Sequence, residues 1–434
     1  MDVGGSKPSR PTDRDLSAPG ENVDTSAPEI RRVQRRTIWL LALAQIFSGL
    51  ATGAALSVGS LLAVDLSGSE AWAGSVTTAV TLGAAITSAL LIRLAVARGR
   101  RIALSSGLLA ALVGAALVIA AVSAHQFWLL LVGALLVGAG TSVGLQSRFA
   151  ATDLSAPQHR GRDLSLIVWM STVGSVAGPN LIAPGERIAD AVGIPALAGV
   201  FVISVAAMIV GLLVIWIGLR PDPLLLARQH GADGSAARPR FRDGMAAFRG
   251  NWRASGALAA MLVAHFTMVA VMAMTPVHLL HHGAEVTVIG ITISLHIAGM
   301  YALSPVMGIL ADRLGGGLIA ASGLVVLVVA VLVAGLSGTD YVATTVGLIL
   351  LGLGWSAVTV AGSATIVGAV AADVRVAAQG VTDTTMSLAG VLGGVLSGVV
   401  LAWIGYAGLG IACGILCVIA IPVVLRLVRR PIAR

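Results

Sequence analysis

The chain alternates long apolar segments with short polar connections. From Thr37 onward we count twelve apolar segments, near residues 38–62, 72–95, 102–123, 126–147, 164–183, 194–218, 254–279, 287–309, 317–337, 341–368, 378–402 and 405–427. Each approximates the roughly 20 residues that a helix needs to cross a bilayer core about 30 Å thick. The pattern therefore predicts an all-α polytopic membrane protein with twelve transmembrane helices.

A polar, arginine-rich loop at residues 220–253 separates the first six segments from the last six. The two halves share a pattern of small residues in their fourth segments, in which Gly133, Leu136, Gly138, Gly140 and Ser142 recur at one constant offset as Gly347, Leu350, Gly352, Gly354 and Ser356. An offset near half the chain length is typical of a parallel repeat. We therefore expect two six-helix bundles, residues 37–219 and 254–427.

Positive charge is distributed unevenly between the two sides of these segments. The chain carries 28 Lys and Arg residues and a formal net charge of +8. If both termini are cytosolic, only Arg187 among these residues lies on the outer side, as the positive-inside rule requires. We expect a multi-pass protein of a bacterial cytoplasmic (inner) membrane with both termini cytosolic. Its positive charge then meets anionic lipid headgroups of the bilayer, and no nucleic-acid partner is needed to explain it.

The polar ends and the composition narrow the class of protein further. Residues 1–36 are rich in Pro, Ser, Gly and charge, which predicts a disordered cytosolic tail, and residues 428–434 form a second, short tail. With 57% hydrophobic and 11% charged residues, the chain differs from soluble domains. Two cysteines exclude a disulfide framework. Because the sequence has no Walker-type motif and no catalytic residue set, we expect neither an enzyme nor a bound cofactor.

The loop between the eighth and ninth segments contains the most specific motif. It reads Gly308-Ile-Leu-Ala-Asp312-Arg313-Leu-Gly315, which resembles the cytosolic G-x-L-A-D-R-x-G signature of the major facilitator superfamily of transporters. The resemblance covers residues 38–427 and implies the superfamily's fold, with Gly308, Asp312, Arg313 and Gly315 as a conformational latch. The corresponding loop after the second segment, residues 98–101, lacks an acidic residue, which argues against a symmetric charge latch in both halves.

The fifth segment contains a second motif. Gly174-x-x-x-Gly178-Pro179 resembles the antiporter motif of drug exporters in the same superfamily. Small residues spaced by four also let helices pack closely in any membrane protein. The sequence leaves both interpretations open, an exporter motif and a helix-packing motif.

The seventh and eighth segments stand out by their composition. Residues 254–309 hold six of the eleven methionines and five of the eight histidines, namely Met261, Met268, Met272, Met274, Met300 and Met307 with His265, His278, His281, His282 and His296. Methionine often fills gaps in helix cores. Its concentration here together with histidine indicates a binding site.

The spacing places four of these residues on two helix faces. Met268 and Met272 are four apart, as are His296 and Met300, so each pair lies on one face, one turn apart. A short turn at residues 281–285 joins the two segments as antiparallel neighbours. At about 1.5 Å per residue, Met272 and His296 lie roughly 18 Å from the turn, and Met268 and Met300 roughly 24 Å. The four side chains can therefore meet near the bilayer midplane, where such transporters bind substrate, unless Pro276 kinks the seventh segment.

Thioether sulfur and imidazole favour one kind of ion. Both are neutral and suit Cu(I) better than Mg, Ca or Mn, whereas zinc recruits Cys, His or carboxylate, and neither segment contains Asp or Glu. Met268-x-x-x-Met272 and His296-x-x-x-Met300 also resemble the paired motifs of the CcoA-like copper importers of the superfamily. That resemblance implies import of a copper ion as the transported substrate, with these four residues as ligands, and a cytosolic copper-accepting protein as partner.

Further residues are candidates for supporting roles. Four histidines are candidates for a metal relay, namely His265, His278, His281 and His282. The last three are equally interpreted as solvated residues at a helix end. Cys413 and Cys417 suit Cu(I) by their spacing, but their segment is peripheral in the superfamily layout, which favours packing.

Energy coupling usually involves acidic residues within the membrane. Asp383, near the cytosolic start of the eleventh segment, is the best candidate. It is either a proton site or half of an ion pair with an arginine such as Arg148.

These observations combine into one interpretation with two alternatives. We interpret the chain as a monomeric alternating-access secondary transporter that imports copper through a Met/His site at the bilayer midplane. The first alternative is a proton-coupled multidrug exporter, and the second is a membrane receptor that binds copper without moving it. An exporter depends mainly on an intramembrane acid, whereas a copper importer depends on the Met and His pairs.

Overall fold

The computed structural model describes residues 28–155, 159–229, 241–371 and 374–429, and these ranges contain helices, turns and loops but no strand. The helices are α1 Pro28–Ser67, α2 Ser75–Arg98, α3 Arg100–Ser123, α4 Phe127–Ala150, α5 Arg160–Ala177, α6 Ile182–Val192, α7 Gly199–Gly218, α8 Pro223–Gln229, α9 Phe241–Phe248, α10 Trp252–His281, α11 Val286–Tyr301, α12 Ser304–Leu314, α13 Gly316–Gly335, α14 Tyr341–Ala369 and α15 Arg375–Arg429. Three short 3-10 turns accompany them, η1 Glu70–Trp72, η2 Gly178–Leu181 and η3 Ala196–Ala198.

The number of membrane crossings follows from these helices. In the described ranges, ten helical stretches are long and apolar enough to cross a membrane. One of them, α15, contains two crossings, because Gly405 interrupts it with φ 69° and ψ −178°. The 18-residue helix α5, whose first turn carries Asp163, supplies another crossing. The all-α fold with twelve apolar helices that the sequence predicts is therefore confirmed.

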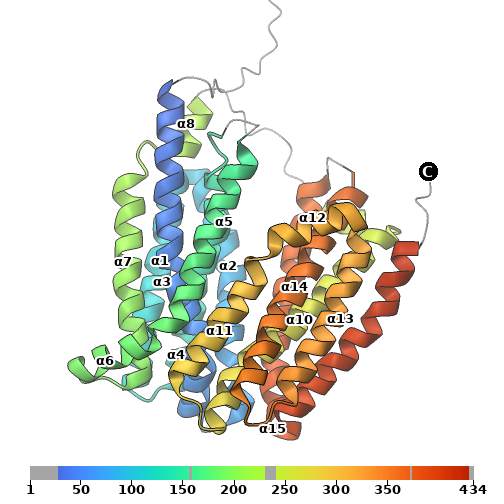
Figure 1. Cartoon of the computed structure of the whole chain (residues 1–434). Helices are drawn as coiled ribbons and strands as arrows, with labels where there is room; N and C mark the ends of the chain where they lie inside the picture. The colour runs from blue at the N-terminus through green and yellow to red at the C-terminus, as the bar shows by residue number, and fades with distance from the viewer. Residues whose placement is uncertain (1–27, 156–158, 230–240, 372–373, 430–434) are drawn as a thin grey trace, which may run out of the picture.

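Two of the predicted segments are broken helices. The fifth is divided into α5, η2 and α6, and the eighth into α11 and α12. Pro179 lies in η2, and Pro305 occupies the first turn of α12. Proline has no N–H to donate, and its ring clashes with the preceding turn of a helix, which explains both breaks. Beyond its break, α6 projects sideways from the helices around it (Figure 1).

The predicted boundaries need three corrections. Residues 28–36, assigned to a disordered tail, form the start of α1, where buried Gln34 donates from Nε2 to the Ala151 carbonyl at 2.7 Å and to the Asp163 carboxylate at 3.1 Å. Residues 1–27 lie outside the described ranges. The central loop at 220–253 contains α8, α9 and the first residues of α10. At the other end of the chain, helical structure continues to residue 429, into the segment predicted as a tail.

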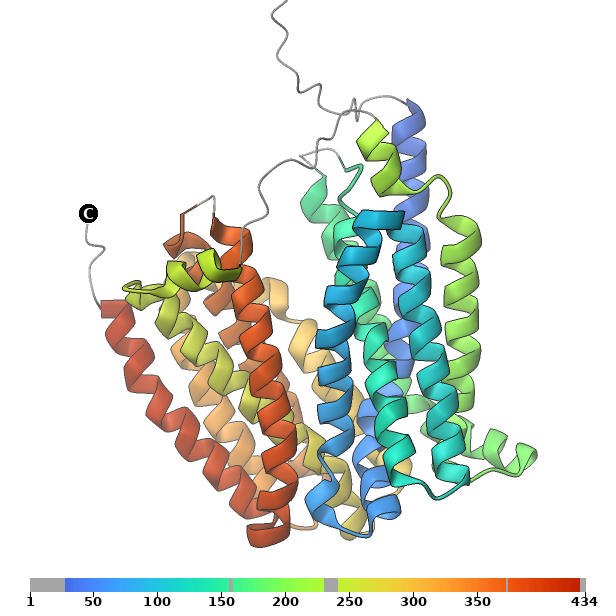
Figure 2. The ribbon, with the colours of Figure 1, turned by 180° about the vertical axis from the view of Figure 1, so that it is seen from behind.

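The helices form two bundles, α1–α7 and α10–α15 (Figures 1 and 2). The start of α1, the end of α15, and helices α8 and α9 all lie at one end of the molecule, which we call the arginine-rich end. We call the other end the opposite end. In both views the bundles approach each other at the opposite end and diverge toward the arginine-rich end.

Direct contacts between the bundles lie toward the opposite end. The hydrogen bonds there join Thr78 to the Val391 carbonyl (3.4 Å), Asn180 to the Ser294 hydroxyl (2.7 Å), and Ser294 to the Val176 carbonyl (2.7 Å). The hydroxyl of Ser294 thus donates to one residue of the first bundle and accepts from another. These contacts hold the bundles together at this end.

Four glycines bring the two backbones into contact at the same end. Gly74, before α2, lies directly against Gly394 of α15. A Cβ on Gly398 would lie 2.6 Å from the Ala71 carbonyl, and one on Gly290 would lie 2.5 Å from the Pro179 carbonyl. Real Cβ atoms do not approach so closely, so only glycine fits. We call Gly74, Gly290, Gly394 and Gly398 the glycine seal.

Candidate functional site

The predicted site depends on how α10 and α11 lie relative to each other. A short turn joins them, but α14 packs extensively against both, and they contact each other far less. The expectation that these two helices are neighbours along their length is therefore wrong. A short turn holds only the helix ends together, and α14 packs alongside both helices beyond it.

α14 provides a common reference for the depth of side chains on both helices. Trp355 of α14 donates from its indole nitrogen to Nδ1 of His265 on α10 (3.0 Å). α10 and α14 run in opposite directions across the membrane. Met268 and Met272, three and seven residues beyond His265, therefore lie closer to the opposite end than Trp355 by about 4.5 and 10.5 Å.

α11 runs parallel to α14, and its contacts with α14 give the depths of His296 and Met300. Nδ1 of His296 forms a 2.8 Å hydrogen bond to the Leu348 carbonyl, and Gly352 lies directly against the backbone of Met300. Leu348 and Gly352 lie seven and three residues from Trp355, the same spacings that separate the two α10 methionines from His265. The backbones of the two predicted pairs therefore lie at matching depths along α14.

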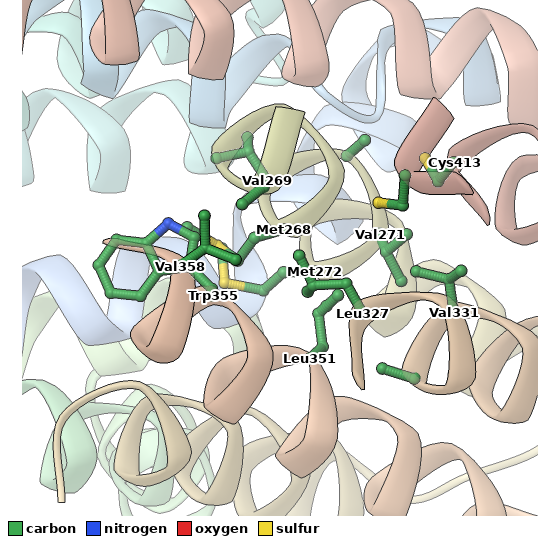
Figure 3. Close-up of a cluster of buried hydrophobic side chains, with 14 of the residues drawn as sticks. Met268, Val269, Val271, Met272, Leu327, Val331, Leu351, Trp355, Val358 and Cys413 are labelled. Carbon is green, nitrogen blue, oxygen red and sulfur yellow. The ribbon is translucent and has the colours of Figure 1, made fainter. Parts of the chain in front are cut away.

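The α10 methionines extend toward α14. Met268 and Met272 are each 4% exposed and belong to one buried cluster. Figure 3 shows their side chains directed toward the part of α14 that carries Leu351, Trp355 and Val358. Side chains on a helix lean toward its N-terminus, which accounts for this direction. In this conformation both thioethers pack against apolar neighbours.

The environment of His296 is different, because this histidine is completely buried and polar. Its Nδ1 carries the proton, since the Leu348 carbonyl that it contacts can only accept. Nε2 is then a lone-pair acceptor, and it has no hydrogen-bond partner among the described residues. Leaving such an atom unpaired costs about 1–3 kcal/mol. Histidines that bind metal commonly donate their second N–H to a backbone carbonyl in this way.

The four relay candidates separate into three places. His265 contacts Trp355, as described above, near the middle of α10. His278 and His282 lie together at the opposite end, with ring centroids 4.4 Å apart. His281 points instead to Glu70 of the other bundle, at 3.7 Å. Within the described ranges no group of three or more His, Cys, Asp or Glu side chains forms a metal site.

The two cysteines are buried free thiols in the last crossing of α15. Thr267 of α10 places its hydroxyl 3.5 Å from the Cys417 sulfur. Both cysteines belong to the same apolar cluster as the α10 methionines. This position is consistent with a packing role.

Asp383 lines a pocket of about 170 Å³ between α14 and α15, together with Ser363, Ile366, Gln379 and Thr382. Arg148 of α4, in the other bundle, interacts electrostatically with Asp383 and also with Tyr301 of α11. Among the described residues no ion pair within 4.0 Å involves Asp383. The proposed pair with Arg148 is therefore not closed in this conformation.

The latch motif forms the end of α12. Gly308, Asp312 and Arg313 lie within the helix, and Gly315 ends it with φ 92°, a left-handed conformation that favours glycine. Asp312 and Arg313 are both exposed.

The corresponding loop of the first bundle obtains its acidic partners from elsewhere in the chain. Arg100 binds Asp153, after α4, through Nε and a terminal nitrogen at 2.8 and 3.1 Å. The N–H of Arg101 donates to Asp222, before α8, at 2.8 Å. Burial raises the pKa of Asp153, and the Arg100 guanidinium opposes that rise. Both acids lie far from residues 98–101 along the chain, so local spacing does not predict them.

Gly174 and Gly178 pack α5 against α1. A Cβ on Gly178 would lie 3.0 Å from the Ala54 nitrogen, and one on Gly53 would lie 3.0 Å from Pro179. The small residues therefore act as a helix-packing motif. The same segment also contacts the second bundle, through Pro179 and Gly290.

Comparison with known sequences gives a consistent result. The sequence model of the Major Facilitator Superfamily matches residues 41–287 and 256–434. Two uncharacterised MFS-type transporters of Bacillus subtilis (strain 168), YdeG and YddS, are each 36% identical to the chain, over 92% of it and over 94% and 92% of their own lengths. The riboflavin transporter RfnT of Brucella anthropi is 28% identical, over 81% of this chain and 85% of its own.

Solved structures show the same fold. A bacterial homologue of the human lysosomal transporter Spinster, in an inward-facing and unoccupied conformation, superposes with a TM-score of 0.72 at 17% identity, over 93% of this chain and 97% of its own. The nucleoside transporter NupG gives a TM-score of 0.71 at 16% identity, over 91% of this chain and all of its own. From its sequence, its relatives and its two six-helix bundles, the chain belongs to the Major Facilitator Superfamily.

Proposed function

We propose that this membrane-spanning secondary transporter imports copper, as Cu(I), by alternating access. The observation that carries the proposal is the buried Nε2 of His296, which has no hydrogen-bond partner in the part of the chain that the structure describes, while Nδ1 is bonded to the Leu348 carbonyl. That arrangement presents an imidazole lone pair at the depth of Met272, in the Met pair of α10. A soft, singly charged ion is the metal that such neutral ligands hold at the lowest desolvation cost.

On this proposal the methionines complete the coordination by rotation of their side chains. Met has three rotatable side-chain bonds and adapts to irregular spaces. Met272 and Met300 are 4% and 7% exposed and lie within one turn of His296 in depth. Rotation of their thioethers toward Nε2 would give a three-ligand site, with Met268 one turn further toward the arginine-rich end.

The break between α11 and α12 supports a binding site at this depth. It follows Tyr301 directly, so Met300 occupies the last turn of α11. Transporters commonly bind substrates at such discontinuous helices. With the arginine-rich end on the cytosolic side, the structure faces inward, and we propose that the ion leaves there toward a copper-accepting protein.

The test is uptake of radioactive copper into cells that lack their own importer. Met272→Leu and Met300→Leu keep the packing volume but remove the sulfur ligand, so uptake should fall to background, as it should for His296→Ala. The matched control is Met274→Leu, because Met274 is completely buried on the same helix but lies outside the motif. If the three site variants, at equal membrane abundance, transport copper as the wild type and the control do, the copper site is wrong.

A second candidate is transport of a planar aromatic solute. Tyr301 and Trp355 form an edge-to-face pair with centroids 6.0 Å apart, Trp355 donates a hydrogen bond to His265, and Arg148 of the other bundle interacts electrostatically with Tyr301. Such rings stack on flat organic molecules, and the similarity to a riboflavin transporter favours a flavin.

Uptake of labelled riboflavin into a strain without its own transporter tests this candidate. Uptake that is lost in Trp355→Ala and retained in Met272→Leu would support the flavin and contradict copper. No uptake above the empty-vector strain would exclude riboflavin as the substrate.

A further inference from the structure

A pair of histidines lies at the opposite end of α10, apart from the site at the midplane. His278 and His282 are four residues apart, so their side chains share one helix face, and their ring centroids are 4.4 Å apart. His278 is only 7% exposed, whereas His282 is exposed at the end of the helix. The pair therefore joins a buried imidazole to one at the surface.

The His278 ring and the His282 backbone are each held by a neighbouring side chain. His278 stacks on Tyr406 with centroids 4.2 Å apart and ring planes 15° from parallel, and the Tyr406 hydroxyl hydrogen bonds to Thr275 at 2.8 Å. The carbonyl of His282 accepts a 2.6 Å hydrogen bond from the Tyr341 hydroxyl. Stacking covers a face of the His278 ring but leaves the nitrogen atoms at its edge available.

The hydrogen bonds leave one nitrogen of each ring able to bind a ligand. Nδ1 of His282 donates to the His278 carbonyl at 2.8 Å, so its Nε2 is a lone-pair acceptor. Nε2 of His278 is buried and has no hydrogen-bond partner among the described residues, although the Gly338 backbone interacts with the same ring. Donation to a backbone carbonyl is the usual second interaction of a metal-binding histidine.

The electrostatic surroundings also favour a cation. The pair occupies the C-terminal end of α10, where the helix dipole places partial negative charge. His281 lies between His278 and His282 in sequence, and the carboxylate of Glu70 from the other bundle is 3.7 Å from it. A negative charge therefore lies close to the pair.

We infer that His278 and His282 form a second metal site, which takes a transition-metal ion that prefers imidazole ligands. Such ions include copper and zinc. On the proposed function, from which the identity of the ion follows, the site binds Cu(I) at the outer side before the ion reaches His296. Two imidazoles from the chain leave its remaining coordination positions to water or to a delivering molecule.

The test uses the purified full-length transporter in lipid nanodiscs, titrated anaerobically with Cu(I) against a chromophoric chelator. The double variant His278→Ala/His282→Ala should bind one copper ion fewer than the wild type. The matched control His281→Ala should bind as many as the wild type, because His281 points to Glu70. A variant of the midplane site, with Met268, Met272, His296 and Met300 replaced by Ala, should retain the outer ion.

The outer site is wrong if the double variant binds as many ions as the wild type with unchanged affinity, or if the wild type binds none. Should the double variant fail to fold, His282→Ala alone decides, because it leaves the His278–Tyr406 stack in place. It should weaken the outer site about tenfold or more, since loss of even an outer-shell partner of a metal ligand has that effect.

Uptake measurements separate this inference from the proposed function. Loss of the outer pair should raise the copper concentration needed for half-maximal uptake and leave the maximal rate unchanged. If copper binds at the outer pair but no copper enters the cells, the import proposal fails and the outer site stands. If uptake depends on His296 and the double variant behaves as the wild type in binding and uptake, the outer site fails and import stands.

Discussion

Individual buried polar atoms show where single residues carry function. Arg100 and Asp153, with side chains 13% and 11% exposed, satisfy each other through two hydrogen bonds. In contrast, Nε2 of His278 and of His296 have no such partner among the described residues. Most buried polar side-chain atoms in proteins are paired, and a neutral imidazole nitrogen can bind a metal, so these two unpaired nitrogens are candidates for a ligand.

We expect Arg100→Ala to destabilise the first bundle by about 1–3 kcal/mol, between the cost for an exposed pair and that for a fully buried one, because this pair is partly exposed. Burial already raises the pKa of Asp153, and Arg100 opposes that rise. Without the guanidinium the pKa rises further, so Asp153 takes up a proton as the pH falls and its buried charge disappears. The loss of stability should therefore be larger at pH 8 than at pH 5.

Thermal unfolding of the purified protein in detergent, followed by tryptophan fluorescence, measures this difference. Arg98→Ala is the control, because Arg98 is exposed two residues away. Equal losses of melting temperature at both pH values would show that the charge on Asp153 is not the cause.

For single residues, the sequence predicted where Met and His are concentrated, but not which polar side chains pair with each other. The concentration of Met and His in residues 254–309 is visible without coordinates. The partner of Arg100 is not, because Asp153 is brought to it by the fold across 53 positions of the chain. Long-range pairs of this kind depend on the tertiary structure, which local spacing does not determine.

Among the helices, α14 determines how the candidate site is organised. The constant rise of a helix let the sequence predict matching depths for the Met and His pairs, and the contacts of α14 with His265 and His296 agree with those depths. The sequence did not show that α14 packs against both helices. That arrangement depends on close contacts at Gly352 and Gly299, where α14 meets α11. Such contacts are properties of two surfaces rather than of one segment.

The glycine seal gives a prediction about helix contacts. We expect Gly290→Leu to prevent close contact of α11 with Pro179, so that the bundles separate more often at the opposite end. In a protein with both native cysteines replaced by Ala, Ser294→Cys should then react faster with a membrane-impermeant thiol reagent, since Ser294 is 5% exposed in the closed contact.

The control for this measurement is Gly368→Leu. A Cβ on Gly368 meets no atom of the described residues within 4 Å, so an equally large side chain there should leave the labelling rate unchanged. The seal would be the wrong explanation if both leucine variants were labelled at the rate of the parent protein.

The whole molecule is closed at one end and open at the other. The bundles meet at the glycine seal, whereas Arg148 and Asp383 belong to different bundles, interact electrostatically, and form no ion pair within 4.0 Å in this conformation. Rocking of the bundles that opens the opposite end brings the arginine-rich ends together. We therefore expect Arg148 and Asp383 to form an ion pair in the outward-facing state.

Charge exchange tests this pair. Asp383→Asn and Arg148→Gln should each slow uptake several-fold, and the exchanged variant Arg148→Asp/Asp383→Arg should recover part of the lost rate, because it restores opposite charges. Initial uptake rates at equal protein abundance measure the effect. Normal transport by Asp383→Asn at every pH would exclude both the ion pair and the proton site.

The global architecture was the most predictable feature of this chain. Span number, halves and repeat follow from hydropathy and from the recurrence of Gly133 and its neighbours at Gly347 and its neighbours. The conformation was not predictable, because open and closed states share the same helices. The conformation depends on which contacts between the bundles are formed, those at the opposite end or those at the arginine-rich end.

The glycine seal separates two tasks that a carrier must perform. The seal consists of main-chain atoms and of glycines, which have no side chain, whereas on the proposed function recognition belongs to the residues around His296 that contact α14. On that proposal we expect substitutions around His296 to alter the choice of substrate while the closure at the opposite end stays intact. In this architecture a new substrate specificity can evolve without a change in the helix contacts that close the opposite end.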